Sequence, residues 1–200
     1  MTRAIRSPGS TLKPFIYGLA FEDGFVHPDS LIEDRPIRFG SYAPENFDMT
    51  FQGTVPIRKA LQLSLNVPAI ALLDRVGASR LSSRLKQAGT SLVLPKDEAP
   101  GLAMGLGGVG ITLQDLAQLY SGLARLGATK PLREIMQEND SRDTMRLMDQ
   151  AAAGRSATSC LAHRRRRTAC TTGSRSRPAP ATAIAMPGRS ASTAASRSAS

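Results

Sequence analysis

Cysteine, histidine and long apolar runs are scarce or missing in this 200-residue sequence. The two cysteines, Cys160 and Cys170, lack companions at metal-ligand spacing, so the sequence predicts neither a disulfide framework nor a zinc site. No apolar run is long enough to cross a bilayer. Residues 1–11 carry no apolar stretch after their basic residues, so they do not resemble a signal peptide.

Acidic residues are missing from the last quarter of the chain. Residues 154–200 hold 9 Arg and no Asp or Glu, and their only large aliphatic residues are Leu161, Ile184 and Met186. Such a stretch cannot bury enough apolar surface to offset the entropy lost on ordering. Residues 1–153 hold 17 Lys and Arg against 16 acidic residues, an ordinary balance for a folded protein. The composition therefore predicts one folded part, residues 1–153, and a disordered Arg/Ala/Ser-rich tail, residues 154–200.

The excess of Arg in the tail raises the alternative of a non-enzymatic basic protein that binds nucleic acid. His163-Arg-Arg-Arg-Arg167 is its densest basic run, but no aromatic side chains accompany it for stacking on bases. Nucleic acid is therefore not an expected partner. Steeply salt-dependent DNA binding that vanishes on deletion of residues 154–200 would favour this alternative.

Apolar spacing predicts that the folded part is mainly helical. Residues 25–54, which hold three prolines, are expected to form a long ordered loop with short strands. Thr112 and Asp115 resemble a capping box. The glycine-rich run 105–110 matches a dinucleotide-binding pattern by letter, but no βαβ unit surrounds it, which favours a close-packed turn. The helices are predicted over residues 11–24, 57–65, 69–77, 79–89, 111–127 and 140–153.

Ser10-Thr-Leu-Lys13 is the first candidate for chemistry. Ser10 stands where the N-cap of the first predicted helix belongs, and Lys13 follows one turn later, so the two side chains are expected within hydrogen-bond reach. The positive potential of a helix N-terminus, with burial, lowers a lysine pKa toward the range where the neutral amine takes a proton from serine. An ordinary N-cap serine followed by a solvated lysine fits the same four residues, since Ser-x-x-Lys is common by chance.

Ser64-Leu-Asn66 is the second candidate and lies at the predicted break between two helices. There Ser64 would pass a proton to a leaving amine, and Asn66 would hold the amide of a substrate peptide. An asparagine that stops a helix before Val-Pro explains Asn66 equally well. The two motifs together, each at a helix terminus, favour an acyl-transfer site.

Several longer segments resemble one family, the transpeptidase domain of class A penicillin-binding proteins, with the 1C type as the nearest. The resemblance covers about residues 1–150 and is specific over nearly all of them. It is carried by RSPGSTLKPFIYGLAFEDG, HPDSLIEDRP, FGSYAPENFD, SLNVPAIALLDRVG and GLAMGLGGVGITLQDLAQLYSGLARLG.

This resemblance implies a fold and a reaction. The fold is a mainly α fragment of the α/β serine β-lactamase and penicillin-binding transpeptidase fold, with the central sheet largely missing. The reaction is peptidoglycan D,D-transpeptidation through a serine acyl-enzyme. Ser10 is then the nucleophile, Lys13 its base and Ser64 a proton donor, while Asn66 binds substrate.

The resemblance also implies the partners and the location. Peptidoglycan stem peptides ending in D-Ala-D-Ala and β-lactams are the expected partners, and no metal or organic cofactor is expected. Family members act on the periplasmic face of the inner membrane. This chain shows no anchor of its own, so membrane association is expected only through an upstream region, which in the family also includes a glycosyltransferase domain.

The family's third motif, Lys-Thr-Gly on a strand beside the cleft, does not occur in the sequence. A single lost base near Gly154 explains this, because shifting the frame over residues 177–190 can restore KTGTSYGYRDAWAI. The tail is therefore predicted to be frameshifted, and the chain is expected to have little or no activity. A related serine acyl hydrolase, either a β-lactamase or a D,D-carboxypeptidase, is the remaining alternative because it shares Ser-x-x-Lys.

Overall fold

The computed structural model describes residues 3–40, 42–94, 100–132 and 144–171. As predicted, this part of the chain is mainly helical. Its elements are the 3₁₀-helices η1 (Gly9–Leu12) and η2 (Leu102–Leu106), the α-helices α1 (Lys13–Glu22), α2 (Ile57–Gln62), α3 (Asn66–Val76), α4 (Ala78–Gln87), α5 (Leu113–Ala124) and α6 (Gln150–Thr171), and the strands β1 (Leu31–Asp34), β2 (Gly53–Pro56), β3 (Ala128–Thr129) and β4 (Met145–Arg146).

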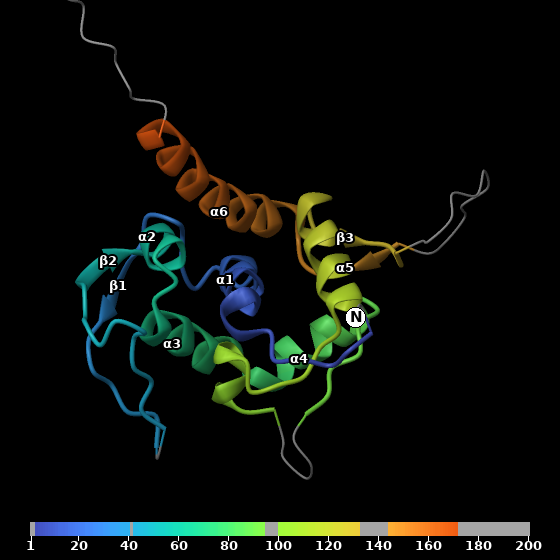
Figure 1. Ribbon diagram of the computed structural model, residues 1–200, viewed down its shortest axis with the longest axis horizontal. Coiled ribbons are helices and arrows are strands. Elements are labelled where there is room, and N and C mark those ends of the chain that lie inside the picture. The colour runs from blue at the N-terminus through green and yellow to red at the C-terminus, as the bar shows by residue number, and fades with distance from the viewer. Residues whose placement is uncertain (1–2, 41, 95–99, 133–143, 172–200) are drawn as a thin grey trace, which may run out of the picture.

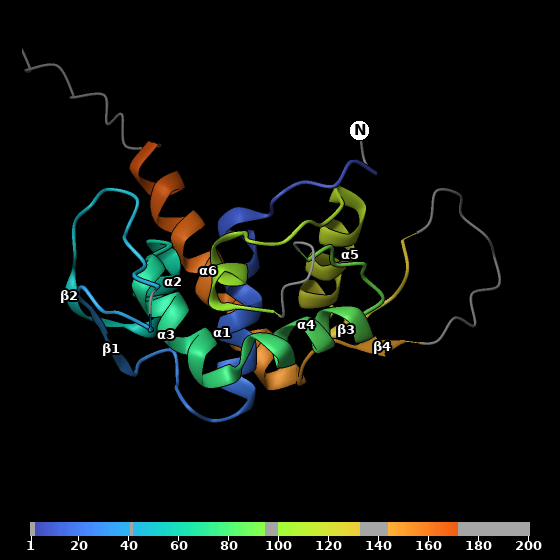
Figure 2. The ribbon, with the colours of Figure 1, turned by 90° about the horizontal axis from the view of Figure 1, so that it is seen from below.

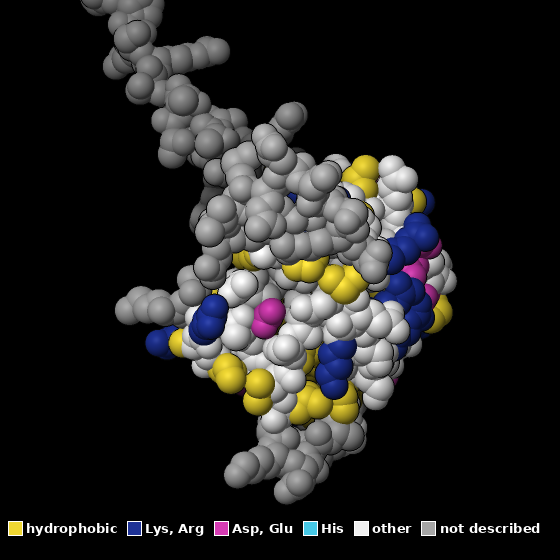
Figure 3. All heavy atoms as spheres, turned by 90° about the vertical axis from the view of Figure 1, so that its right-hand side faces the viewer, with side chains coloured by type: hydrophobic (Ala, Val, Ile, Leu, Met, Phe, Trp, Pro, Cys, Tyr) yellow, Lys and Arg dark blue, Asp and Glu magenta, His cyan; other side chains and the backbone are white. Residues whose placement is uncertain are grey.

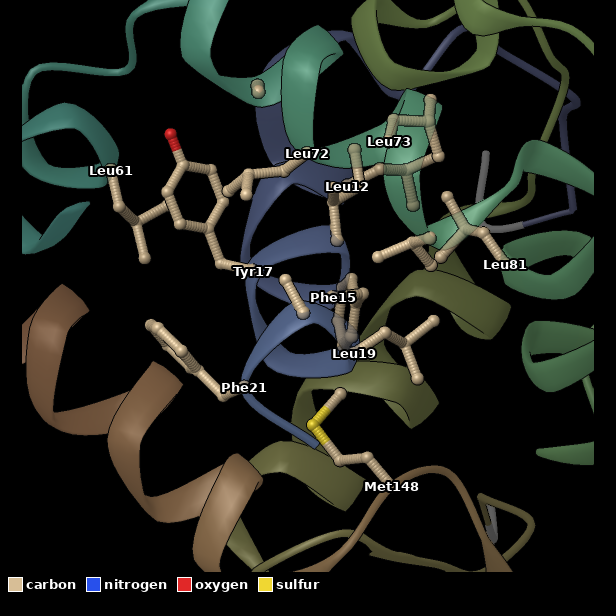
Figure 4. Close-up of a cluster of buried hydrophobic side chains, with 14 of the residues drawn as sticks. Leu12, Phe15, Tyr17, Leu19, Phe21, Leu61, Leu72, Leu73, Leu81 and Met148 are labelled. Carbon is tan, nitrogen blue, oxygen red and sulfur yellow. The ribbon is translucent and has the colours of Figure 1, made fainter. Parts of the chain in front are cut away.

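Helix α1 is the centre of the molecule. Its residues are apolar around most of the helix circumference, and every residue from Lys13 to Phe21 is buried, as expected for a helix with no polar face. Helix α6 lies on one side of α1 and α3 on the other (Figure 1). Phe15, Tyr17, Leu19 and Phe21 radiate from α1 into the surrounding core (Figure 4).

Helix α6 continues well past residue 153. Ala152, Ala153 and Ser156 are buried, and the Ser156 hydroxyl donates a hydrogen bond of 2.7 Å to the Pro14 carbonyl of α1. Residues 154–161 are thus helical and packed on the folded part, so the helix runs past the predicted boundary at residue 154. Small side chains let α6 approach α1 closely, so it packs without the large aliphatic residues that the composition lacks. The rest of the predicted tail, residues 172–200, lies outside the described residues.

The close packing around α1 depends on a glycine in its middle. A Cβ atom on Gly18 would lie 2.6 Å from the Met148 sulfur, closer than real Cβ contacts. Glycine weakens an exposed helix, but here it lets the segment before α6 reach the helix backbone. The predicted helix over residues 140–153 is wrong at residues 144–149, because Met145–Arg146 forms β4 and α6 begins only at Gln150, while residues 140–143 lie outside the described residues.

Two small antiparallel sheets flank the helices, at opposite ends of the view in Figure 2. Strands β1 and β2 pair from Leu31 opposite Pro56 to Asp34 opposite Gly53, and β3 pairs with β4. The prediction of short strands within residues 25–54 is confirmed. Each sheet has only two strands, so in the described residues the helices supply most of the core.

Helix α5 begins as the sequence predicts. The Thr112 hydroxyl accepts a hydrogen bond from the Asp115 backbone N–H and donates one to the Asp115 carboxylate, which satisfies one orphan donor of the first turn. Residues 105–110 form a close-packed turn, which confirms that interpretation. A Cβ on Gly105 would meet Ile70 and Leu73 at 3.0 Å, and one on Gly108 would meet the Ala103 backbone at 2.9 Å.

Charged side chains of both signs share the surface of the folded part. On the face in Figure 3, basic side chains lie beside acidic ones along one edge, and hydrophobic side chains occur in small groups. Arg80 and Arg84 contact Glu22 and Asp23, which agrees with the nearly balanced charge of residues 1–153. No helix within the described residues is long and apolar enough to cross a membrane.

Candidate active site

Lys13 lies buried at the first turn of α1, where its side chain has 1% of its surface exposed. Its ammonium group donates hydrogen bonds to the Ser64 carbonyl at 2.5 Å, the Ser64 hydroxyl at 3.1 Å and the Asn66 side-chain oxygen at 2.6 Å. These three oxygens use all three donors of the ammonium group. The structure thus brings the lysine of the first motif together with both polar residues of the second.

Burial lowers the pKa of Lys13 from 10.5 to about 8. The ammonium group has given up most of its hydration, and the three oxygens that it contacts carry no formal negative charge, so its charged form is only partly compensated. A lysine with this pKa has a substantial fraction of neutral amine near pH 8. Such an amine can accept a proton from a neighbouring hydroxyl.

Ser64 occupies a strained turn between α2 and α3. Its φ angle is +56°, a left-handed conformation that costs a non-glycine residue about 1–2 kcal/mol. The turn is closed by backbone hydrogen bonds from Ser64 N to the Leu61 carbonyl and from Leu65 N to the Ala60 carbonyl. This bend turns the Ser64 carbonyl and hydroxyl toward Lys13, while the residue itself remains exposed to solvent.

Asn66 is the first residue of α3. The sequence predicted Asn66-Val67-Pro68 as a break between helices, but Val67 and Pro68 lie within the first turn of α3, where a proline costs no hydrogen bond. The Asn66 side chain accepts from Lys13 and donates to the Glu45 carbonyl at 2.6 Å. Its carboxamide is therefore fixed on both sides.

Ser10 lies in η1, one turn before Lys13, and is exposed. The sequence predicted Ser10 as an N-cap, which is wrong, because the 3₁₀-helix begins at Gly9 with Pro8 as its cap residue. The loop in front of Ser10 is held by the end of η2, since the Ser7 hydroxyl donates to the Gly107 carbonyl at 2.6 Å. A Cβ on Gly107, whose φ is +99°, would lie 2.6 Å from the Gly9 nitrogen, so only glycine fits there.

The predicted hydrogen bond between Ser10 and Lys13 is not present among the described residues. Lys13 Nζ contacts Ser64 and Asn66 instead, because those residues supply three oxygens to a buried ammonium group that needs them. Ser10 nevertheless stays one turn away on the same helical segment. Catalytic hydrogen bonds often tighten only when substrate is bound, so this geometry leaves Ser10 as a candidate.

Local sequence patterns did not predict two residues behind this site, Asn46 and Asp34. Asn46 is 3% exposed and Asp34 is fully buried, which is unusual for such polar residues. Asn46 accepts a hydrogen bond from the Asn66 backbone N–H at 2.8 Å. Nothing in local spacing marks them, because Asn46 sits in the long loop and Asp34 ends a strand of only four residues.

Tyr17 lies one turn beyond Lys13, and its buried hydroxyl has no hydrogen-bond partner among the described residues. Burial, and to a smaller degree the negative charge of Asp34, raise the pKa of Tyr17 well above its usual value. The phenol therefore stays neutral.

Within the described residues, no three His, Cys, Asp or Glu side chains lie close enough together to share a metal ion.

The sequence of this chain is similar to those of several known proteins. A family model described as the penicillin binding protein transpeptidase domain matches residues 1–159. Penicillin-binding protein 1C of Escherichia coli (strain K12) is 44% identical over 153 residues, which are 76% of this chain and 20% of that protein. Penicillin-binding protein 1F of Bacillus subtilis (strain 168) is 36% identical over 132 residues, 64% of this chain and 18% of that protein.

A third relative, penicillin-binding protein 1A of Pseudomonas aeruginosa, is 34% identical over 148 residues, 70% of this chain and 17% of that protein. The chain thus spans about a fifth of the length of these relatives. The region of similarity includes all the residues of the candidate site.

Proposed function

The chain belongs to the penicillin-binding protein transpeptidase family, as its motifs predict, and we propose that it carries the nucleophile region of a peptidoglycan D,D-transpeptidase. The observation that carries this proposal is Lys13, a buried lysine with a lowered pKa that contacts the hydroxyl of Ser64 one turn from an exposed Ser10. That arrangement suits activation of a serine hydroxyl by a neutral amine.

In the proposed reaction, Ser10 is the nucleophile, Lys13 is its base and Ser64 is the proton donor to the leaving group. The Ser10 oxygen attacks the carbonyl of the penultimate D-Ala of a stem peptide, and its proton passes to the Lys13 amine. The Ser64 hydroxyl delivers a proton to the nitrogen of the departing D-Ala as the peptide bond breaks, and the Lys13 ammonium group returns its proton to Ser64. An amine of a second stem peptide then attacks the Ser10 ester, its proton passes to the Ser10 oxygen as the ester bond breaks, and the crosslink forms with the serine restored.

Asn66 has a binding role in this proposal. Its carboxamide is fixed by Lys13 and Glu45, so it presents a defined donor and acceptor edge to the site. A substrate peptide amide can pair with such an edge without the entropy cost of ordering the side chain. A β-lactam, which carries a strained amide in place of the D-Ala-D-Ala bond, is expected to acylate the same serine.

We also propose that the 200-residue chain acylates only slowly by itself. It contains no Lys-Thr-Gly triplet, the motif that supplies part of the oxyanion hole in the family. Loss of one oxyanion donor typically costs about 10²–10³ in rate. A frameshift near Gly154 remains our explanation, and a genomic read with an intact frame would exclude it.

The test is the intact mass of the purified chain after hours with a penicillin at millimolar concentration. We expect a slowly formed adduct of one penicillin per chain, located at Ser10 by peptide mapping and missing in Ser10→Ala. An adduct that persists in Ser10→Ala, or no adduct at all, would overturn the proposed nucleophile. Rapid stoichiometric labelling would overturn the proposed low activity, and fast release of hydrolysed penicillin would favour a β-lactamase.

A further inference from the structure

A chain of hydrogen bonds runs from the Lys13 ammonium group to a buried carboxylate. Lys13 Nζ donates to Asn66 Oδ1 at 2.6 Å, and the Asn66 backbone N–H donates to Asn46 Oδ1 at 2.8 Å. Asn46 Nδ2 then donates to both carboxylate oxygens of Asp34, at 2.9 and 3.0 Å. Lys13, Asn46 and Asp34 are each at most 3% exposed, so the chain links a buried cation to a buried anion through two asparagines.

The direction of every link is fixed by chemistry. A lysine ammonium group and a backbone N–H can only donate, whereas a carboxylate and a backbone carbonyl can only accept. Asn66 Nδ2 faces the Glu45 carbonyl, and Asn46 Nδ2 also faces the Thr50 carbonyl at 2.9 Å. Neither carboxamide can be turned over without setting donor against donor. All links therefore donate toward the carboxylate, an alignment in which neighbouring hydrogen bonds strengthen one another.

Asn46 also completes the N-terminus of α3. The residue before this helix, Leu65, has no side chain that can cap it, so the first backbone N–H groups lack a local partner. Asn46 supplies an acceptor to one of them from a loop twenty residues earlier. Asp34 in turn accepts from the Gln52 backbone N–H at 2.8 Å, which ties the loop that carries Asn46 to β1 and to the segment before β2.

We propose that Asn46 and Asp34 are positioning residues of this site. Asp34 orients the Asn46 carboxamide, Asn46 holds the start of α3, and the Asn66 side chain there holds the Lys13 amine in place beside Ser64. Neither residue contacts the reacting atoms. The role of these two residues in catalysis rests on the proposed function. Their effect on the position of Lys13 does not, because that position can be measured without a substrate.

The experiment measures how fast Lys13 is acetylated by acetic anhydride in the full 200-residue chain, at a fixed pH. Lys86 is exposed and serves as an internal standard, so peptide mass spectrometry gives a Lys13-to-Lys86 ratio for each variant. In Asn46→Ala we expect this ratio to rise about tenfold, because Asn66 loses the hydrogen bond that fixes it and its hold on the amine weakens by about the worth of one typical hydrogen bond. Asp34→Asn should raise it similarly, because an amide there sets donor against donor.

Gln118→Ala is the matched control. Gln118 is also a buried carboxamide, 5% exposed, and its Nε2 donates to the Ala88 carbonyl at 2.8 Å in a different part of the core. Its loss should lower the melting temperature by an amount similar to Asn46→Ala but leave the Lys13-to-Lys86 ratio within about twofold of the wild type. If the control raises the ratio as much as Asn46→Ala, Asn46 merely stabilises the fold and the proposal fails.

Exchanging the side chains of Asp34 and Asn46 should restore the slow acetylation of Lys13. In the double variant Asp34→Asn/Asn46→Asp, an amide at position 34 donates to a carboxylate at position 46, which still accepts from the Asn66 backbone. The ratio should return to within about threefold of the wild type, although the Thr50 carbonyl loses its donor. A double variant no better than Asn46→Asp alone would overturn the proposed orientation.

Failure of this proposal can be told apart from failure of the proposed function. The penicillin adduct at Ser10 tests the function, whereas the acetylation ratio needs no penicillin. A Ser10 adduct in the wild type together with an unchanged ratio in Asn46→Ala would remove the positioning role alone. The expected ratios without any adduct would support the positioning of Lys13 and remove the acylation.

Discussion

The two ends of α1 each bury a charged side chain, and they compensate its charge in different ways. At the C-terminal end, Glu22 forms ion pairs with Arg84 and Arg80 and accepts a hydrogen bond from the Asp149 backbone. At the N-terminal end, Lys13 donates to three neutral oxygens, and two asparagines link it to the Asp34 carboxylate. The C-terminal end of α1 thus holds neighbouring elements together by ion pairs, whereas the N-terminal end contains a lysine that loses its proton more easily than an exposed lysine.

The largest expected effect is on acylation, from Lys13→Met. Methionine fills a similar volume and removes the cost of burying a charge, but it leaves the Ser64 carbonyl and the Asn66 side-chain oxygen without their donor. The slow penicillin adduct at Ser10 should fall by about 10²–10⁴, as for the loss of a general base, while the melting temperature changes little because the two effects oppose each other. Intact mass and thermal unfolding measure the two effects. A fully active Lys13→Met variant would show that Lys13 is not the base.

A second test sharpens the comparison by pH. Because the pKa of Lys13 falls from 10.5 to about 8 on folding, the unfolded chain binds more protons than the folded chain between these values. The free energy of unfolding should therefore rise by roughly 2 kcal/mol from pH 8 to pH 10, relative to Lys13→Met. Urea unfolding of both proteins measures the difference. A flat difference would mean that Lys13 is not desolvated in the folded state.

The substitution Glu22→Gln removes the carboxylate that forms ion pairs at the C-terminal end of α1. Arg84 loses its carboxylate partner, while Arg80 keeps its closer pair with Asp23. The free energy of unfolding should fall by about 2 kcal/mol because the lost pair is only partly buried. Position 22 lies nine residues from Lys13, about 13 Å along the helix, so the acetylation rate of Lys13 should not change. A change in that rate would show that the two ends are coupled.

The smallest effect is expected from Ser64→Gly set against Ser64→Ala. Both remove the hydroxyl, but glycine relieves the left-handed backbone, so Ser64→Gly should be more stable by about 1 kcal/mol. Both variants should lose the acylation that depends on proton transfer through Ser64. Equal stability of the two variants would mean that the turn relaxes to another conformation.

Local sequence patterns predicted most of the helices, because apolar periodicity and capping are local properties. They did not predict the partners of Lys13, which come from Ser64 and Asn66. The capping of α5 by Thr112 appeared where the sequence placed it. What the sequence missed depends on the tertiary structure. Asn46 caps a helix from a distant loop, and α6 packs through small residues such as Ser156, which lies in the stretch whose composition predicted no core.

The contact between Ser7 and Gly107 determines when the loop before Ser10 can fold during synthesis. The loop before Ser10 is held by the end of η2 and by the pairing of Arg6 with Ile111, about a hundred residues later in the chain. At ribosomal rates of about 5–20 residues per second, the serine leaves the ribosome several seconds before its support exists. Ser10 is thus synthesised about a hundred residues before the residues that hold the loop in front of it.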